Sequence, residues 1–208
     1  SGTNFDATKL AYDDLGRLIR TKEPSGTIRR TVYDARGQVI ERWVGTDDTG
    51  LAGSDCAGSS NVLKTEAIQY DSGSDKGNGY VTQRTLYLDD VPNTRVTAFT
   101  NDAFGRPCIV APPTPPYALH KYDNLHRVVA TGLFSSTSGL TISTDPTSTE
   151  TNRLALTQTK FDELGRVWRT IRHKIGTSTG ADNDSLNADS WFDADRRLVK
   201  VQGPSFQK

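Results

Sequence analysis

Catalysis would require histidine, cysteine or carboxylate side chains at a recognisable spacing, and few such groupings occur here. The three histidines, His120, His126 and His173, stand at unrelated positions outside any HExxH or similar zinc-binding pattern. The phosphate-loop and GxGxxG patterns of nucleotide-binding enzymes do not occur in the sequence. We therefore predict a protein that is not an enzyme, with no catalytic residues and no cofactor.

One acidic stretch, Asp182-Asn183-Asp184, is a weak candidate for a metal site. Carboxylate and amide oxygens suit Ca²⁺, but the stretch lacks the Gly and Glu that calcium loops place at fixed offsets. A solvated surface turn is the simpler interpretation, and we predict that no metal is bound.

The aspartates and arginines fall instead into one repeated motif, aromatic-Asp-x-x-Gly-Arg-apolar. The better copies keep most positions, and the third keeps only the first two. The motif residues are Tyr12, Asp13, Gly16 and Arg17; Tyr33, Asp34 and Gly37; Tyr70 and Asp71; Asp102, Gly105 and Arg106; Tyr122, Asp123 and Arg127; Phe161, Asp162, Gly165 and Arg166; Phe192 and Asp193.

This motif has the chemistry of a hairpin turn. The aromatic residue ends one strand, and the Asp carboxylate accepts nearby backbone N–H groups. Gly supplies a positive φ, and the Arg-apolar pair begins the return strand. Seven copies at one turn position argue for a structural role, because paired-carboxylate catalysis needs a single site. We expect the motif arginines to form a ladder with neighbouring aspartates across strands.

Composition also favours strands and turns. The chain has 26 Thr, 20 Asp and 18 Gly but only 5 Glu among its 208 residues, and these abundant residues are poor helix formers. The fold class we predict is all-β, with antiparallel β-hairpin repeats in a coiled or spiral sheet. Twenty-five basic residues balance 25 acidic ones, which argues against a nucleic-acid partner. No apolar run is long enough for a membrane span, and Cys56 and Cys108 are interpreted as separate free thiols.

The spacing of the motif predicts a larger repeat of about 90 residues. Steps of 21, 37 and 31 residues follow Asp13, and steps of 21, 39 and 31 follow Asp102. We therefore divide the chain into the end of a preceding repeat (1–12), a first super-repeat (13–101), a second (102–192) and the start of a third (193–208). The ends in mid-repeat suggest a piece of a longer array.

The longer steps contain insertions rich in Gly, Ser, Thr and Asp. We expect these to be exposed loops at hairpin tips, on one side of the array, because their composition is unsuited to a core. They are Gly45–Asn61 and Ser135–Asn152, with a shorter pair at Ser72–Gly79 and Gly176–Asn187.

The repeated motif, with the Pro24-Ser25-Gly26 turn after its first copy, resembles the YD-repeat or RHS-repeat family from Phe5 to Pro204. The resemblance implies an antiparallel sheet that coils as a wide spiral. Large members close it into a hollow shell around a toxin, and others are surface or wall-associated proteins. The family's self-cleaving aspartate motif and Pro-rich end are not seen in this sequence, and the insertions depart from the regular rhythm of about 21 residues.

The resulting functional hypothesis is a non-catalytic extracellular or cell-surface scaffold, filament or YD-repeat array. The alternatives are a fragment of an RHS-type shell around a polymorphic toxin, and a carbohydrate-binding adhesin that uses its aromatic and Arg side chains. The expected partner is the protein itself or the continuing parent chain, through head-to-tail sheet continuation. Glycans are a further candidate partner.

Overall fold

The computed structural model describes residues 6–51, 61–73, 77–88 and 93–206, and its regular structure is almost entirely β. Fourteen strands and one short 3₁₀ helix, η1 (Asp71–Gly73), follow one another along the chain. The strands are β1 (Lys9–Tyr12), β2 (Leu18–Lys22), β3 (Ile28–Tyr33), β4 (Val39–Gly45), β5 (Leu63–Tyr70), β6 (Val81–Tyr87), β7 (Thr94–Asn101), β8 (Pro107–Ala111), β9 (Tyr117–Tyr122), β10 (Val128–Phe134), β11 (Arg153–Phe161), β12 (Val167–Ile175), β13 (Asp182–Phe192) and β14 (Leu198–Phe206).

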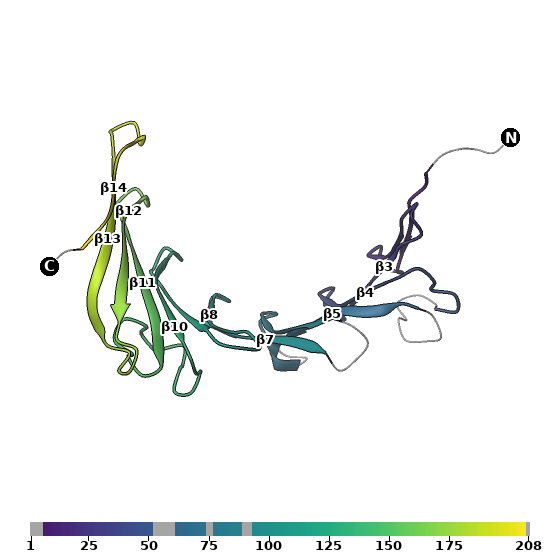
Figure 1. The fold of residues 1–208 in the computed structure, drawn as a ribbon. Helices are drawn as coiled ribbons and strands as arrows, with labels where there is room; N and C mark the ends of the chain where they lie inside the picture. The colour runs from purple at the N-terminus through teal and green to yellow at the C-terminus, as the bar shows by residue number, and fades with distance from the viewer. Residues whose placement is uncertain (1–5, 52–60, 74–76, 89–92, 207–208) are drawn as a thin grey trace. The chain divides into compact units, whose positions relative to one another are not determined.

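The strands form a meander in which each lies beside its neighbour in sequence, in the order β1 to β14. These strand pairs are antiparallel, and Figure 1 shows the consecutive strands β10 to β13 side by side. The predicted all-β fold of antiparallel hairpins is therefore confirmed. In the part of the chain that the structure describes, no helix has the length and apolarity needed to cross a membrane.

Every hairpin with the repeated motif closes with the same irregularity in register. Tyr12 pairs with Leu18 while Ala11 pairs with Arg20, so one residue of the return strand has no partner. The same slip occurs before Tyr33, Asn101, Tyr122, Phe161 and Phe192. A type I turn followed by a left-handed residue produces this bulge, and the bulge increases the local twist of the hairpin.

By internal contacts the chain falls into two units, residues 1–97 and 98–208. Among the described residues of unit 1, the buried apolar ones are Ile19, Ile28 and Val62, and Arg30, Glu66 and Thr85 are buried as well. In unit 2 the core cluster is Ile109, Leu119 and Phe134, with Leu140 packed against it. The division into super-repeats at 101/102 stays a prediction.

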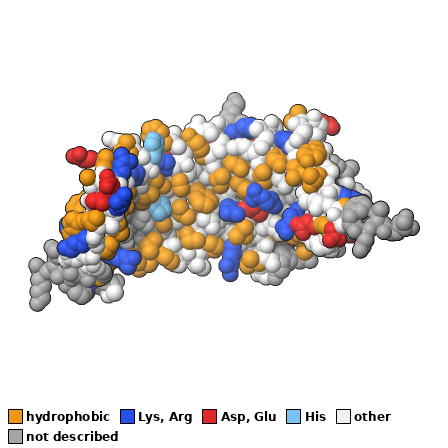
Figure 2. All heavy atoms as spheres, turned by 90° about the horizontal axis from the view of Figure 1, so that it is seen from above, with side chains coloured by type: hydrophobic (Ala, Val, Ile, Leu, Met, Phe, Trp, Pro, Cys, Tyr) orange, Lys and Arg blue, Asp and Glu red, His pale blue; other side chains and the backbone are white. Residues whose placement is uncertain are grey.

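Neither unit has a large core. Nine apolar residues are buried among the described residues, whereas twenty large hydrophobic residues are exposed. Figure 2 shows such hydrophobic side chains in patches over the face in view, between groups of basic and acidic side chains. A single sheet layer has two faces and only its own loops to cover them, which explains how little of it is buried.

The two long insertions are loops between β4 and β5 and between β10 and β11, and most of their described residues are exposed, as predicted, but a few contact the sheet. In Ser135–Asn152, Pro146 is fully buried and Leu140 packs on the core cluster, so this insertion covers part of its own sheet. In Gly45–Asn61, Asp48 binds two arginines of β2 and β3, while 52–60 lie outside the described residues. The Gly176–Asn187 prediction is wrong beyond Ala181, because β13 already begins at Asp182.

Candidate functional site: the repeated turn

The motif aspartate holds its turn together through its side chain. In the hairpin after β7, Asp102 Oδ1 accepts the backbone N–H groups of Phe104 (2.9 Å) and Arg106 (3.0 Å). The same pair of bonds occurs at Asp13, Asp34, Asp123 and Asp162, and Asp193 accepts the second of them. The prediction that the Asp carboxylate accepts nearby backbone N–H groups is therefore confirmed. The partners lie within four residues of the aspartate.

The glycine position requires a left-handed backbone. Gly16, Gly37, Gly105 and Gly165 have φ between +75° and +83°. Two turns keep this conformation without glycine, at His126 (φ +62°) and Arg196 (φ +67°). A residue other than glycine in the left-handed region destabilises the backbone by about 1 kcal/mol or more relative to glycine. The contacts of the surrounding turn must therefore hold His126 and Arg196 in this conformation.

The motif arginine connects its own turn to the next one. Arg106 Nε donates to Asp102 Oδ2 at 2.6 Å, while its guanidinium lies 4.6 Å from the ring centroid of Tyr122, the aromatic residue of the following motif. The same arrangement joins Arg17 to Tyr33, Arg127 to Phe161 and Arg166 to Phe192. The predicted pairing of motif arginines with aspartates is therefore found, but the carboxylate belongs to the arginine's own turn and not to a neighbouring strand. Arg17 and Arg106 also donate to the backbone carbonyls of Asp34 and Asp123 in the next turn. Each arginine binds the aspartate four residues before it and reaches the neighbouring repeat through a cation–π contact.

The tyrosine hydroxyl adds a second link in the reverse direction. Tyr33 donates to the carbonyl of Leu18, Tyr70 to that of Val39 and Tyr122 to that of Pro107, each at 3.1 Å. In each case the acceptor is the first residue of the return strand in the preceding turn. Neighbouring hairpins are thus coupled through side chains as well as through the sheet.

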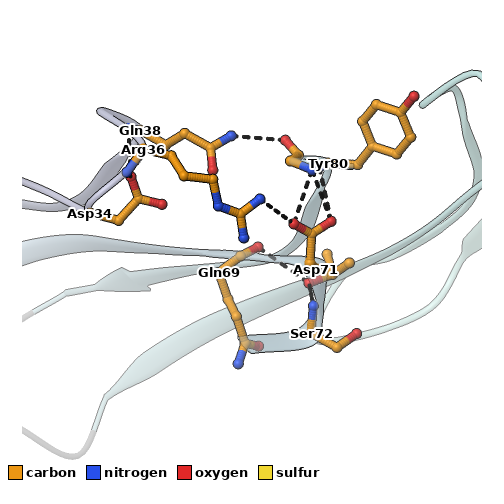
Figure 3. A network of polar contacts seen from close by, with 9 residues as sticks. Asp34, Arg36, Gln38, Gln69, Asp71, Ser72 and Tyr80 are labelled. Atoms are coloured by element: carbon orange, nitrogen blue, oxygen red, sulfur yellow. Dashed lines mark hydrogen bonds and ion pairs between the residues drawn. The ribbon is translucent and has the colours of Figure 1, made fainter. Parts of the chain in front are cut away.

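The third copy of the motif forms a different network, shown in Figure 3. Asp71 lies in η1 with φ +50°, and its carboxylate accepts the N–H of Gly79 at 2.9 and 3.0 Å. Arg36 of the preceding turn donates to Asp71 Oδ2 at 3.0 Å, and Gln38 Nε2 donates to the Gly79 carbonyl. Gln38 occupies the usual arginine position, and Gln38 and Arg36 link these two repeats through polar contacts.

The charges of the turn carboxylates are stabilised by these bonds. The backbone N–H of Arg17 is the main cause that lowers the pKa of the Asp13 carboxyl, and it prevails over partial burial. At Asp102, burial opposes ionisation, but hydrogen bonds from the Arg106 side chain and backbone prevail and lower the pKa below its usual value. The anion is therefore the form that the folded turn favours.

We expect Asp102→Ala to destabilise unit 2 by about 0.5–2 kcal/mol, by analogy with the loss of a helix cap. Because the folded state lowers this pKa, the contribution is present above the ordinary value near 4 and is lost as pH falls through the lowered value. Urea unfolding at pH 7 and pH 2 measures both effects. Glu163→Ala, an exposed carboxylate in another turn, should change little, and an equal cost for the two variants would contradict a role in the turn.

A second grouping, around Cys108 and His120, was not singled out as a site in the sequence. Both residues line a hollow beside Tyr122, and the register of β8 and β9 brings them opposite each other. Burial raises the pKa of the Cys108 thiol and lowers that of His120, whose Nδ1 lies 3.0 Å from Thr131 Oγ1. A protonated thiol beside a neutral imidazole is a weak nucleophile. Cys108 is free and buried, and Cys56 lies outside the described residues.

The weak calcium candidate does not form a loop. Asp182, Asn183 and Asp184 lie in β13, where successive side chains point to opposite faces. Asp182 Oδ2 lies 2.5 Å from His173 Nδ1, and Asp184 accepts the N–H of Ser185. In the described ranges, no three His, Cys, Asp or Glu residues are placed to share a metal ion.

The sequence analysis did not predict two groups of polar contacts, those of Arg153 and those of Asp48. Arg153, 3% exposed, donates to the carbonyls of Gly180 (3.0 Å), Pro146 (3.0 Å) and Thr147 (3.3 Å), which joins the insertion to the turn before β13. Asp48 joins the other insertion to β2 and β3. The partners of both lie far along the chain or in stretches of loop-like composition, so no local motif indicated them.

Comparison with known proteins gives a family match and a fold match. Residues 12–42 match the model of the RHS repeat. No curated protein matches the chain. Among solved structures, the TcdB2-TccC3-Cdc42 crystal structure has a TM-score of 0.63 at 13% identity, over 99% of this chain and 9% of that one.

Two further structures share this fold. The TcdB2-TccC3 crystal structure has a TM-score of 0.62 at 14% identity, over 99% of this chain and 10% of that one. The Tc holotoxin pore of Photorhabdus luminescens has a TM-score of 0.60 at 14% identity, over 96% and 9%. The present chain thus spans about a tenth of the length of these structures. The repeat matched at 12–42 and the fold shared over nearly the whole chain confirm the predicted resemblance to RHS-repeat proteins.

Proposed function

We propose that this chain is a non-catalytic stretch of the wall of an RHS-type shell, which encloses a toxin within a longer parent protein. The observation that carries the proposal is the fold likeness to TcdB2-TccC3, which extends over 99% of this chain but only a tenth of that one. A wall needs a continuous sheet that resists opening. The arginine and tyrosine links between neighbouring turns within each unit contribute to that resistance.

The two ends of the meander support a partner of the same kind. Among the described residues, β1 pairs only with β2 and β14 only with β13. Leu198, Val199 and Val201 of β14 are 55–60% exposed, with a single lysine, Lys200, among them. An edge with apolar side chains and so little charge is poorly protected against pairing. We propose that further strands of the parent chain cover it, outside the cell or at its surface.

The candidate chemistry of the chain favours a structural role. The motif carboxylates are engaged by backbone N–H groups and arginines, and the Cys108 thiol is held protonated by burial. A carbohydrate-binding role would rest on exposed aromatic side chains such as Trp168 and Trp191, and each of these already carries a cationic neighbour, Arg169 and Lys200.

An extracellular scaffold or filament is the second candidate, because the same edges could join separate copies head to tail. Electron microscopy of the full-length protein that carries these residues distinguishes the two. A hollow particle whose interior protects a cargo domain from added protease supports the shell. The observation of filaments would instead support the extracellular scaffold. A compact solid particle with β14 protected from hydrogen exchange by its own chain's loops would contradict both.

A further inference from the structure

Arg20 and Arg30 place two positive charges side by side in unit 1. They are directly paired across β2 and β3, and Arg30 is only 3% exposed. Like charges at paired positions destabilise a sheet unless an anion lies between them. A buried guanidinium carries a further cost when its charge is uncompensated.

The anion in this structure is the carboxylate of Asp48. Its Oδ2 accepts from Arg20 Nε at 2.5 Å and from Arg30 Nη1 at 2.8 Å, and its Oδ1 accepts from Arg20 Nη2 at 3.0 Å. Arg20 thus presents its planar fork to both oxygens, the arrangement by which guanidinium groups recognise carboxylates. The hydrogen bond from Arg20, opposed by partial burial, and that from Arg30 lower the pKa of Asp48 to about 2.

Asp48 belongs to a short strap, Thr46–Leu51, that has an anchorage of its own. The backbone N–H groups of Thr46 and Asp47 both donate to Asn61 Oδ1, at 2.9 and 2.7 Å. Leu51 lines the same hollow as the two arginines, together with Tyr12 and Ile19. Since the base of the strap does not depend on Asp48, its carboxylate can be removed without removing the strap.

The sheet itself does not require this charged pair. Counted from the turn aspartates Asp13 and Asp102, which are 89 residues apart, Arg20 and Arg30 correspond to Ile109 and Leu119. Those two residues belong to the apolar core cluster of unit 2. Unit 2 therefore holds its insertion by apolar contacts at the positions where unit 1 has two guanidinium groups.

We propose that Arg20 and Arg30 form a carboxylate-binding site, occupied within the chain by Asp48, which accepts another carboxylate when Asp48 is absent or displaced. Its ligand class is a single carboxylate group, held by the fork of Arg20 and one N–H of Arg30. The strap thereby acts as an internal ligand that keeps the site closed.

Restoration of stability by acetate tests the site. Asp48→Ala should lower the melting temperature of the full chain by roughly 5 °C or more, because Arg20 and Arg30 lose their bonds to this carboxylate. Sodium acetate should then raise it in a saturable way, by about 3–6 °C at a tenfold excess over the dissociation constant, whereas sodium chloride at equal ionic strength should not.

Two variants make the result specific. Asp47→Ala removes a carboxylate of the same strap whose hydrogen bonds within the described residues come from Thr49 and not from the two arginines, so its melting temperature should respond equally to acetate and chloride. In Asp48→Ala with Arg20→Met, the acetate response should disappear. Should Asp48→Ala fail to fold, Asp48→Ser also removes the carboxylate and leaves space between the arginines, and acetate should slow hydrogen exchange in β2 and β3 of that variant. Equal responses to acetate and chloride in the folded variant would overturn the proposal.

Discussion

Gly180→Ala is expected to destabilise unit 2 by more than about 3 kcal/mol, an unusually large effect for the addition of one methyl group. Gly180 has φ +72°, and a Cβ at this position would lie 1.8 Å from the carbonyl oxygen of Glu150. That oxygen belongs to the backbone, so the chain itself must move. The movement would also disturb the 3.0 Å bond from Arg153 Nε to the Gly180 carbonyl. Urea unfolding followed by circular dichroism measures the loss.

Gly139→Ala is the matched control for this collision. Gly139 has a similar φ of +79°, but a Cβ there meets nothing within 4 Å. Its substitution should cost about 1 kcal/mol, the conformational penalty alone. Equal losses in the two variants would mean that the close approach of Gly180 to Glu150 does not limit the stability of unit 2.

The repeated turn could be predicted from the sequence because its determinants are local. Asp102 reaches only as far as Arg106, and Gly105 is needed for one backbone conformation. The residues that stabilise the turn all lie within the motif, so the motif is sufficient to predict the turn. Its seven copies make the motif easy to recognise. The all-β fold follows as well, since each turn reverses the chain and joins adjacent strands.

The side-chain contacts between repeats could not be predicted from the sequence of the motif. The arginine of one turn meets an aromatic ring in the next motif, so the motif alone did not reveal its partner, and a pairing with aspartates across strands was expected instead. Tyr33 illustrates the same point, because its hydroxyl donates to Leu18, 15 residues earlier. Spacing in the sequence gives the period of the repeat but not the side-chain geometry between its copies.

The contacts that the insertions make with the sheet were not predicted, because composition reports the average residue and most of these residues are indeed exposed. Ser135–Asn152 is rich in Ser and Thr, yet Pro146 is fully buried and Leu140 packs on the core cluster. In Gly45–Asn61, one aspartate among several binds two arginines. A few well-placed residues determine where such a segment packs, and they are hidden within an otherwise polar stretch.

Phe134→Ala is expected to cost about 3–5 kcal/mol, the usual range for removing a fully buried phenylalanine. Phe134 has no exposed surface and packs with Ile109 and Leu119. A Cβ on Gly132 would lie 2.6 Å from its ring and 2.9 Å from Pro146, so the ring and the insertion fill the space above that glycine. The substitution should therefore loosen Ser135–Asn152 as well as lower the stability of the unit.

Hydrogen exchange and limited proteolysis detect this second effect. In the unmodified chain, the region around Pro146 should resist cleavage, and in Phe134→Ala it should become accessible before the short hairpins do. Phe104→Ala is the control, because Phe104 is 68% exposed at a turn tip and its loss should cost less than about 1 kcal/mol. If the insertion remained protected in Phe134→Ala, its packing would have to depend on the polar contacts of Arg153 instead. Apolar burial would then not be what holds the insertion on the sheet of unit 2.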